Sequence, residues 1–106
     1  IENFVHKYFS EMNYTLKLDQ SAYPFMTDPN TKIVRTIDAA IENVTGIRPK
    51  HSTAGGTSDA RYIAPYGVDV IEFGVRNDTI HAPNERTTRE EVEKLFAVFK
   101  QVIATY

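Results

Sequence analysis

Two polar motifs in the second half of the chain are rich in residue types that bind anions or metals. Residues 55–59 read Gly-Gly-Thr-Ser-Asp, and residues 79–85 read Thr-Ile-His-Ala-Pro-Asn-Glu. Glycines allow backbone torsions that direct successive N–H groups into one concavity, and a helix that begins just after them adds the positive end of its dipole. The glycine loop therefore predicts a site for a substrate carboxylate or a developing oxyanion. The alternative is an ordinary tight turn with a helix N-cap at Ser58 or Asp59.

His81 belongs to the second motif and follows an apolar segment that is typical of a strand. Neutral imidazole is a common zinc ligand, and α/β proteins place binding residues just after strands. Asn77 lies four residues earlier and could bond a substrate oxygen, whereas Glu85 lies four residues later and could orient a ligand. A solvent-facing loop histidine is the alternative. Since one histidine cannot hold a catalytic metal alone, the pattern predicts an incomplete site.

The other two histidines lack metal-ligand spacing to His81. We interpret His6, on the polar face of a predicted helix, and His51, before the glycine loop, as structural or surface residues. Arg76 could pair with an anionic substrate, or could be an exposed loop arginine. The chain contains no HExxH, CxxC, GxSxG or GxxxxGK[ST] motif, so those metal, redox and phosphate chemistries are not indicated.

The first half of the chain predicts two helices and a strand that precede these motifs. Apolar residues recur with helical spacing over residues 1–12 and alternate with polar ones over 14–18. Residues 21–30 contain two prolines and predict an irregular segment, the best candidate for a boundary between structural units. A second helix is expected over 31–45, with Gly46 as its C-terminal cap.

The second half predicts a short helix that ends at Ala64, a buried strand over 68–75, a polar loop over 76–87 and a final helix. Thr88 and Glu91 form a capping box at the start of that helix. The helix should present one continuous apolar face, formed by Val92, Leu95, Phe96, Phe99, Val102, Ile103 and Tyr106. Because helices and strands alternate, the chain is expected to be α/β or α+β.

Composition fits one soluble domain and excludes several partners. The chain has 106 residues, of which 42% are apolar and 25% charged. Its net charge is −2 without a basic block, so nucleic acid is not expected, and no apolar run is long enough for a membrane span. The absence of cysteine suits the cytoplasm. The chain opens on Ile1 in an amphipathic pattern, and two or three strands cannot cover three apolar helix faces, so we expect a fragment.

Four segments together resemble one enzyme family. They are Ser-Ala-Tyr-Pro-Phe-Met-Thr at 21–27, Ser-Thr-Ala-Gly-Gly-Thr-Ser-Asp-Ala-Arg-Tyr-Ile-Ala at 52–64, Glu-Phe-Gly at 72–74 and the histidine motif at 79–85. In this order they resemble the co-catalytic zinc peptidases, a family that includes carboxypeptidases, acetylornithine deacetylase and aminoacylases. The Ser-x-x-Pro-Phe segment resembles the succinyl-diaminopimelate desuccinylase branch.

The resemblance implies an α/β fold in two parts. Residues 1–22 would be the last helix and strand of a lid and dimerisation domain, and residues 23–106 the C-terminal part of a mixed-sheet catalytic domain. The full-length enzyme would be a cytoplasmic homodimer with two zinc ions per active site, cobalt being an alternative metal. It would hydrolyse N-succinyl-LL-2,6-diaminopimelate, a small N-acyl amino acid, to succinate and LL-2,6-diaminopimelate in lysine biosynthesis.

The resemblance also assigns roles to particular residues. His81 matches a zinc ligand, and Gly56, Thr57 and Asn77 match substrate-binding positions. Gly55, Ser58 and Glu85 are supporting candidates. No catalytic residue is expected here, because the general base and the other ligands would belong to a missing N-terminal part, so this chain alone should be inactive. A related deacetylase or carboxypeptidase, and a non-catalytic dimerisation or binding module, are the alternatives.

Overall fold

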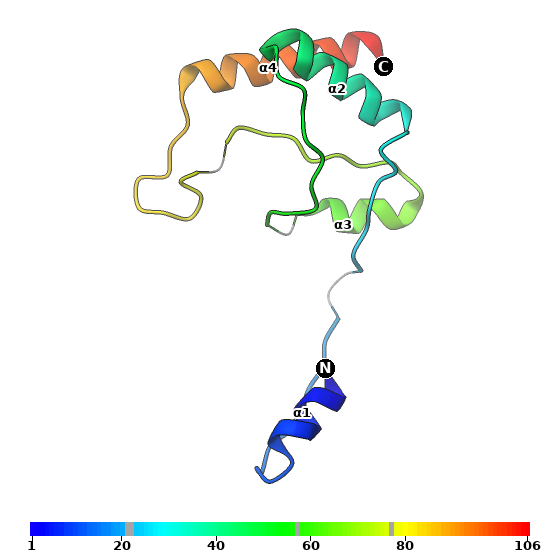
Figure 1. Ribbon diagram of the computed structural model, residues 1–106, viewed down its shortest axis with the longest axis vertical. Coiled ribbons are helices and arrows are strands. Elements are labelled where there is room, and N and C mark those ends of the chain that lie inside the picture. Colours follow the sequence, from blue (N-terminus) through cyan, green and yellow to red (C-terminus); the bar gives the residue numbers. More distant parts are fainter. Residues whose placement is uncertain (21–22, 57, 77) are drawn as a thin grey trace.

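The computed structural model describes residues 1–20, 23–56, 58–76 and 78–106. Figure 1 shows a helical unit from which the N-terminal segment projects. The elements are α1 (Glu2–Phe9), α2 (Lys32–Thr45), α3 (Ala60–Ile63), the 3₁₀ helix η1 (Ala64–Tyr66) and α4 (Arg89–Thr105). No helix within these ranges combines the length and apolarity that a bilayer crossing requires.

Helix α2 confirms the helix predicted over residues 31–45. Its buried side chains are Val34, Ile37, Ala40 and Ile41. Gly46 ends the helix in the left-handed region, with φ of 71°, and its N–H donates to the Glu42 carbonyl oxygen at 2.8 Å. A residue with a Cβ is strained at this φ, so the sequence places glycine where the helix stops.

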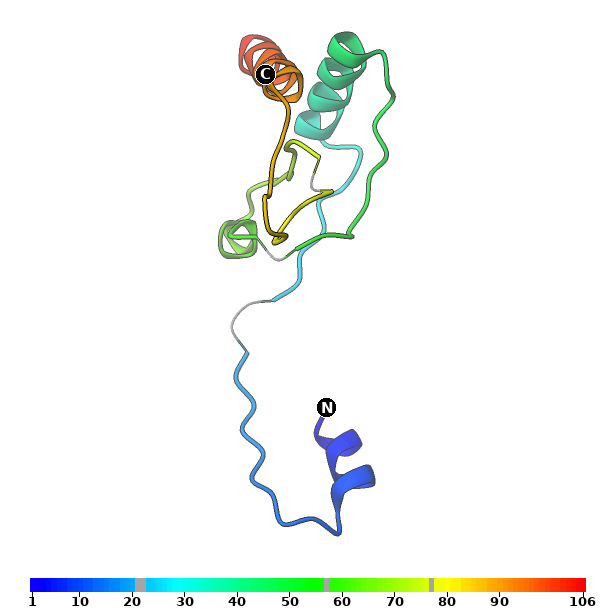
Figure 2. The same ribbon diagram turned by 90° about the vertical axis from the view of Figure 1, so that its left-hand side faces the viewer.

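Helix α4 begins at the predicted capping box. The Glu91 N–H donates to Thr88 Oγ1 at 3.2 Å, and the Thr88 N–H donates to Glu91 Oε2 at 3.1 Å. Helix α4 then packs against α2, and the two lie side by side in both ribbon views (Figures 1 and 2). Val98 is completely buried in this contact, and the Phe73 ring meets the Phe99 ring edge-on at 6.0 Å between centroids.

The core is one small cluster between α2 and α4. It consists of Ile37, Ala40, Ile41, Val98 and Val102, with Ile33, Val44, Ile71 and Phe73 packed against it. The last helix has the predicted apolar face, but this face is only partly covered here, because five of its apolar side chains are exposed. These are Val92, Phe96, Phe99, Ile103 and Tyr106.

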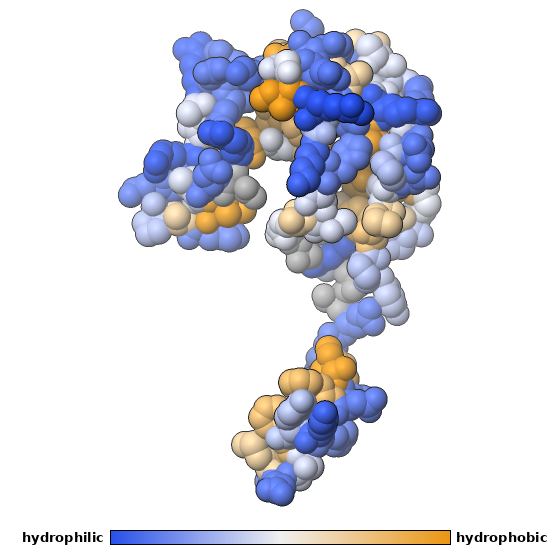
Figure 3. All heavy atoms as spheres, in the orientation of Figure 1, coloured by the Kyte–Doolittle hydropathy of each residue, from blue (hydrophilic) through white to orange (hydrophobic). Residues whose placement is uncertain are grey.

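The chain leaves much of its apolar surface uncovered. Its radius of gyration is 19.3 Å, whereas a compact domain of this length has about 13 Å. Its accessible surface is 9243 Å², whereas a folded monomer of 12.0 kDa exposes about 6000 Å². Figure 3 shows apolar side chains on the projecting N-terminal segment, where Ile1, Phe4 and Tyr8 are exposed. These exposed apolar helix faces are the surface that we expected other segments to cover.

The strands predicted over 14–18 and 68–75 are not confirmed, and the described residues contain no strand. The mixed sheet of the predicted α/β class is therefore not found in this part of the chain. A strand needs the backbone of a neighbour, and here the backbone at Val70 bonds a side chain instead. Thr27 Oγ1 donates to the Val70 carbonyl oxygen at 2.5 Å and accepts from the Val70 N–H at 3.3 Å.

The segment between α1 and α2 is irregular where it is described. The first helix ends at Phe9, earlier than predicted, and residues 13–20 and 23–27 have no regular secondary structure before a turn at 28–31. In that turn the Thr31 N–H donates to the Asp28 carbonyl oxygen at 3.1 Å. Residues 21–22 lie outside the described residues, so the predicted domain boundary there stays a prediction.

Candidate functional site

His81 lies on a tight turn and faces solvent. The Ala82 N–H donates to the Thr79 carbonyl oxygen at 3.0 Å, which closes a four-residue turn with His81 in third place. The φ of His81 is 59°, and a positive φ at the third position is typical of a type II turn. For a residue with a Cβ this conformation costs roughly 1 kcal/mol, so neighbouring contacts must maintain it. The side chain is exposed, as a ligand available to another part of a protein must be.

A second turn follows at once. The Glu85 N–H donates to the Ala82 carbonyl oxygen at 3.1 Å, and Asn84, in third place, has φ of 65°. Pro83 occupies the second position, where its ring fixes the φ that a type II turn needs, and asparagine tolerates the third. The predicted supporting residue Glu85 is exposed at the end of this turn, and we find no side-chain hydrogen bond from it to described residues.

Thr79 joins the two ends of this double turn. Its Oγ1 donates to the Arg86 carbonyl oxygen at 3.1 Å and accepts from the Arg86 N–H at 3.0 Å. Both bonds cross the base of the loop, so residues 79–86, here called the histidine loop, form a closed unit with His81 near its tip. The sequence analysis missed this role of Thr79. A threonine two residues before the histidine was its only signal.

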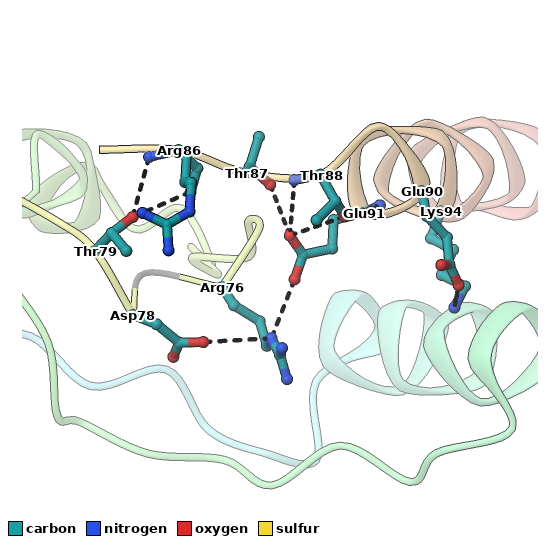
Figure 4. A network of polar contacts seen from close by, with 9 residues as sticks. All are labelled: Arg76, Asp78, Thr79, Arg86, Thr87, Thr88, Glu90, Glu91 and Lys94. Carbon is teal, nitrogen blue, oxygen red and sulfur yellow. Dashed lines mark hydrogen bonds and ion pairs between the residues drawn. The ribbon is translucent and has the colours of Figure 1, made fainter. Parts of the chain in front are cut away.

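Glu91 connects both sides of the histidine loop to α4 (Figure 4). Arg76 Nε donates to Glu91 Oε1 at 3.0 Å and lies 3.6 Å from Asp78 Oδ2. Thr87 Oγ1 donates to Glu91 Oε2 at 2.8 Å, and the Thr88 N–H donates to the same oxygen. The hydroxyl of Thr87, followed by the backbone N–H of Thr88, holds the pKa of Glu91 below its ordinary value.

The glycine loop leads into the very short helix α3. Gly55 has φ of 135°, which a residue with a side chain rarely adopts, and Gly56 is exposed. Ser58 Oγ accepts from the Ala60 N–H at 3.1 Å, whereas Asp59 makes no capping bond, so Ser58 is the residue that bonds the start of α3. Helix α3 has only four residues, so its dipole adds little at the glycine loop, and the predicted anion site stays a prediction.

The described residues do not bring the glycine loop and the histidine loop together. Gly56 and Ser58 line an open cavity of about 1250 Å³ between α2 and residues 70–73. A smaller hollow of about 180 Å³ lies at the base of the histidine loop and is lined by Arg76, Asp78, Thr79, Arg86, Thr87, Thr88 and Glu91. The predicted substrate contacts Thr57 and Asn77 lie outside the described residues.

The two remaining histidines, interpreted above as structural or surface residues, are exposed, and each bonds a neighbouring side chain. His51 Nε2 lies 3.0 Å from Asp38 Oδ1 and 2.9 Å from Oδ2, which ties the segment before the glycine loop to α2. His6 Nδ1 and the Tyr14 hydroxyl are hydrogen-bonded at 2.8 Å. Arg76 is exposed, and the carboxylates that it pairs with are those of Asp78 and Glu91 in this chain.

The described residues do not by themselves fit a metal ion. Within 1–20, 23–56, 58–76 and 78–106, no three histidine, aspartate or glutamate side chains lie close enough to share one. A zinc site needs three or four protein ligands, and His81 offers a single imidazole nitrogen. The described residues therefore do not group the ligands of such a site, and the role of His81 as a single ligand stays a prediction.

Comparison with known proteins identifies the class to which the chain belongs. Residues 5–105 match the model of peptidase family M20/M25/M40. The match covers nearly the whole chain, and the chain belongs to this family.

Several proteins with similar sequences carry the same name. The chain is 71% identical over 106 residues to a succinyl-diaminopimelate desuccinylase of a Nitratiruptor species and 66% identical over 103 residues to one of Nautilia profundicola. It is 44% identical over 106 residues to one of Aliarcobacter butzleri. These alignments cover 100%, 97% and 100% of the chain, but only 29%, 28% and 29% of the relatives.

Proposed function

We propose that the protein to which this chain belongs is a metal-dependent amide hydrolase that acts on N-succinyl-LL-2,6-diaminopimelate. Water would cleave the succinyl amide bond, with its oxygen going to the new succinate carboxylate and hydrogen to the released amine. The 71% identity to a succinyl-diaminopimelate desuccinylase, which extends over all 106 residues, carries this proposal. Membership of the peptidase family supports hydrolysis in preference to a non-catalytic module.

In this proposal the chain contributes one metal ligand, His81. Its exposure and the closed loop beneath it support that role, because a ligand must be both accessible and held in place. Zinc is the expected metal, with two ions per active site and cobalt as the alternative. The other ligands and the general base would come from the rest of the protein, so the isolated chain should not hydrolyse substrate.

The glycine loop and Asn77 are proposed to contact the substrate. Gly56 lines an open cavity, and a Cβ added at Gly55 or Gly56 would meet no neighbour, which suits backbone N–H groups that approach a carboxylate. Thr57 would add a hydroxyl donor, and Ser58 holds the start of α3. The rest of the protein would have to bring this loop and His81 to one active site.

The two-part architecture is also proposed for the full-length protein. Residues 14–18 and 68–75 would pair with strands of the remaining sequence in a mixed sheet, which would supply the backbone partners that they lack here. Residues 1–22 would complete a lid and dimerisation domain, and the exposed apolar side chains of α1 support burial against another surface. The homodimer and the cytoplasmic location stay predictions.

Hydrolysis by the full-length protein tests the proposed function. We expect turnover of N-succinyl-LL-2,6-diaminopimelate, with N-acetylornithine a poor substrate. Removing an outer-shell partner of a metal costs about 10- to 100-fold, so His81→Ala should lower kcat/KM by at least about 100-fold. His6→Ala is the matched control and should retain activity, because His6 bonds Tyr14 on a separate segment.

The alternatives predict different results in the same assay. Faster hydrolysis of N-acetylornithine would indicate a related deacetylase. An absence of hydrolysis for both substrates, in a folded protein loaded with zinc, would contradict the proposed activity.

A further inference from the structure

The two backbone segments that lead into and out of the histidine loop converge on one carboxylate. Arg76, before the loop, donates to Glu91 Oε1 at 3.0 Å, and Thr87, after it, donates to Oε2 at 2.8 Å. Thr79 closes the loop independently through two bonds to the Arg86 backbone. Figure 4 shows these contacts as one network around the base of the loop. Sequence analysis assigned Glu91 only to the capping of α4.

We propose that Glu91 and Thr79 are positioning residues that fix how the loop presents His81 to its metal. This inference rests on the proposed function for the role of His81. Neither residue touches the imidazole in the described contacts, so both would act through the backbone of the loop.

The position of Glu91 explains why it can anchor the loop. It lies in the first turn of α4, and that helix is fixed to α2 through the buried side chains Val98 and Val102. The carboxylate is therefore attached to a helix whose side chains form part of the buried core. A loop residue in the left-handed region keeps that conformation only if its surroundings determine it, and His81 has φ of 59°.

The ion pair between Glu91 and Arg76 is expected to be weaker than the hydrogen bonds that Glu91 accepts from Thr87 and Thr88. The side chain of Glu91 is 25% exposed, whereas that of Arg76 is 77% exposed, so solvent screens this ion pair. The hydroxyl of Thr87 and the N–H of Thr88 donate to a charged oxygen, and such bonds are about twice as strong as neutral ones. We therefore expect Glu91→Ala to loosen the loop more than Arg76→Ala.

Hydrogen exchange in the full-length protein tests the anchoring itself. The informative amides belong to Ala82, Glu85 and Arg86, because their acceptors lie inside the histidine loop. If Glu91 anchors the loop, Glu91→Ala should speed their exchange about tenfold, the effect of losing one to two hydrogen bonds. Faster exchange confined to Thr88 and α4 would mean a capping role alone and would overturn the inference.

Glu93→Ala is the matched control. Glu93 lies two residues further along the same helix and pairs with Arg89 Nε at 2.7 Å, away from the loop. It should leave exchange in the histidine loop unchanged. Thr79→Val keeps the capping box intact and should also speed exchange at Arg86 and Ala82, so it tests the inference even if Glu91→Ala fails to fold.

Zinc affinity, measured by competition with a chelator, tests whether anchoring matters for His81. We expect Glu91→Ala and Thr79→Val to weaken binding about tenfold, toward the lower end of the range for outer-shell partners. Glu91→Gln keeps one oxygen acceptor and should recover most of the affinity, whereas Glu93→Ala should match the wild type.

Two outcomes separate this inference from the proposed function. If His81→Ala leaves zinc affinity unchanged, then the metal role of His81 fails. If His81→Ala abolishes a site while Glu91→Ala and Thr79→Val both bind zinc normally, then the positioning inference alone is wrong.

Discussion

Replacing Ile103 by alanine in the full-length protein should destabilise it as strongly as a change in the core. Ile103 is 81% exposed on α4, and Phe96, seven residues earlier on the same helical face, is 69% exposed. An apolar stripe of this kind on a helix normally faces a core. We expect the remaining sequence of the protein to cover it.

The expected magnitude follows from the atoms removed. Ile103→Ala deletes three carbon atoms, which at about 0.8 kcal/mol per buried methylene gives roughly 2.4 kcal/mol, before any cavity cost. If the side chain kept the exposure that it has here, only about a fifth of that transfer would be lost, roughly 0.5 kcal/mol. The two cases therefore differ by about 2 kcal/mol.

Urea unfolding, monitored by far-UV circular dichroism, distinguishes a covered Ile103 from an exposed one. Val98→Ala is the positive control, because Val98 is completely buried and should cost roughly 2 kcal/mol or more. Lys100→Ala, at an exposed position of the same helix, should stay within about 0.5 kcal/mol of the wild type. An Ile103→Ala variant as stable as Lys100→Ala would refute the reasoning that the outer face of α4 is covered.

Three further predictions concern single contacts in the full-length protein. Thr27→Val leaves the backbone of Val70 without its partner and should cost about 1–3 kcal/mol in urea unfolding, whereas Thr27→Ser should be close to wild type. Gly46→Ala places a Cβ at φ of 71° and should lower the free energy of unfolding by about 1 kcal/mol, although the Cβ itself meets no neighbour. The lowered pKa of Glu91 means that the unfolded chain binds its proton more readily. The stability from Glu91 should thus be present above pH 4.5 and lost as the pH falls through the lower folded pKa, and Glu91→Gln should lack this part of the acid dependence.

Local signals in the sequence predicted the helices well. The capping box at Thr88 and the glycine at 46 mark the start of α4 and the end of α2, because each acts within one helical turn. Local signals were not sufficient for the strands predicted over 14–18 and 68–75, which are not found among the described residues. Their alternating or apolar patterns describe which faces are buried, but a ladder depends on the backbone of segments far away in the sequence.

The candidate site was predictable only where its signals are local in the sequence. The residue type and setting of His81 pointed to a metal ligand, and that assignment stays a prediction. The bond between Arg76 and Glu91 spans fifteen positions, so no local pattern could reveal that a capping glutamate also anchors the loop. The anion site predicted at the glycine loop also stays a prediction, because Thr57 lies outside the described residues and the helix that follows has only four residues.

Zinc titration by calorimetry tests most directly the claim that this chain contributes one ligand to a site completed elsewhere. We predict negligible binding to the isolated 106-residue chain and tight binding to the metal-free full-length protein, with at least one site lost in His81→Ala. Micromolar binding to the isolated chain that disappears in His81→Ala would contradict the account, as would a full-length protein whose zinc binding is indifferent to His81.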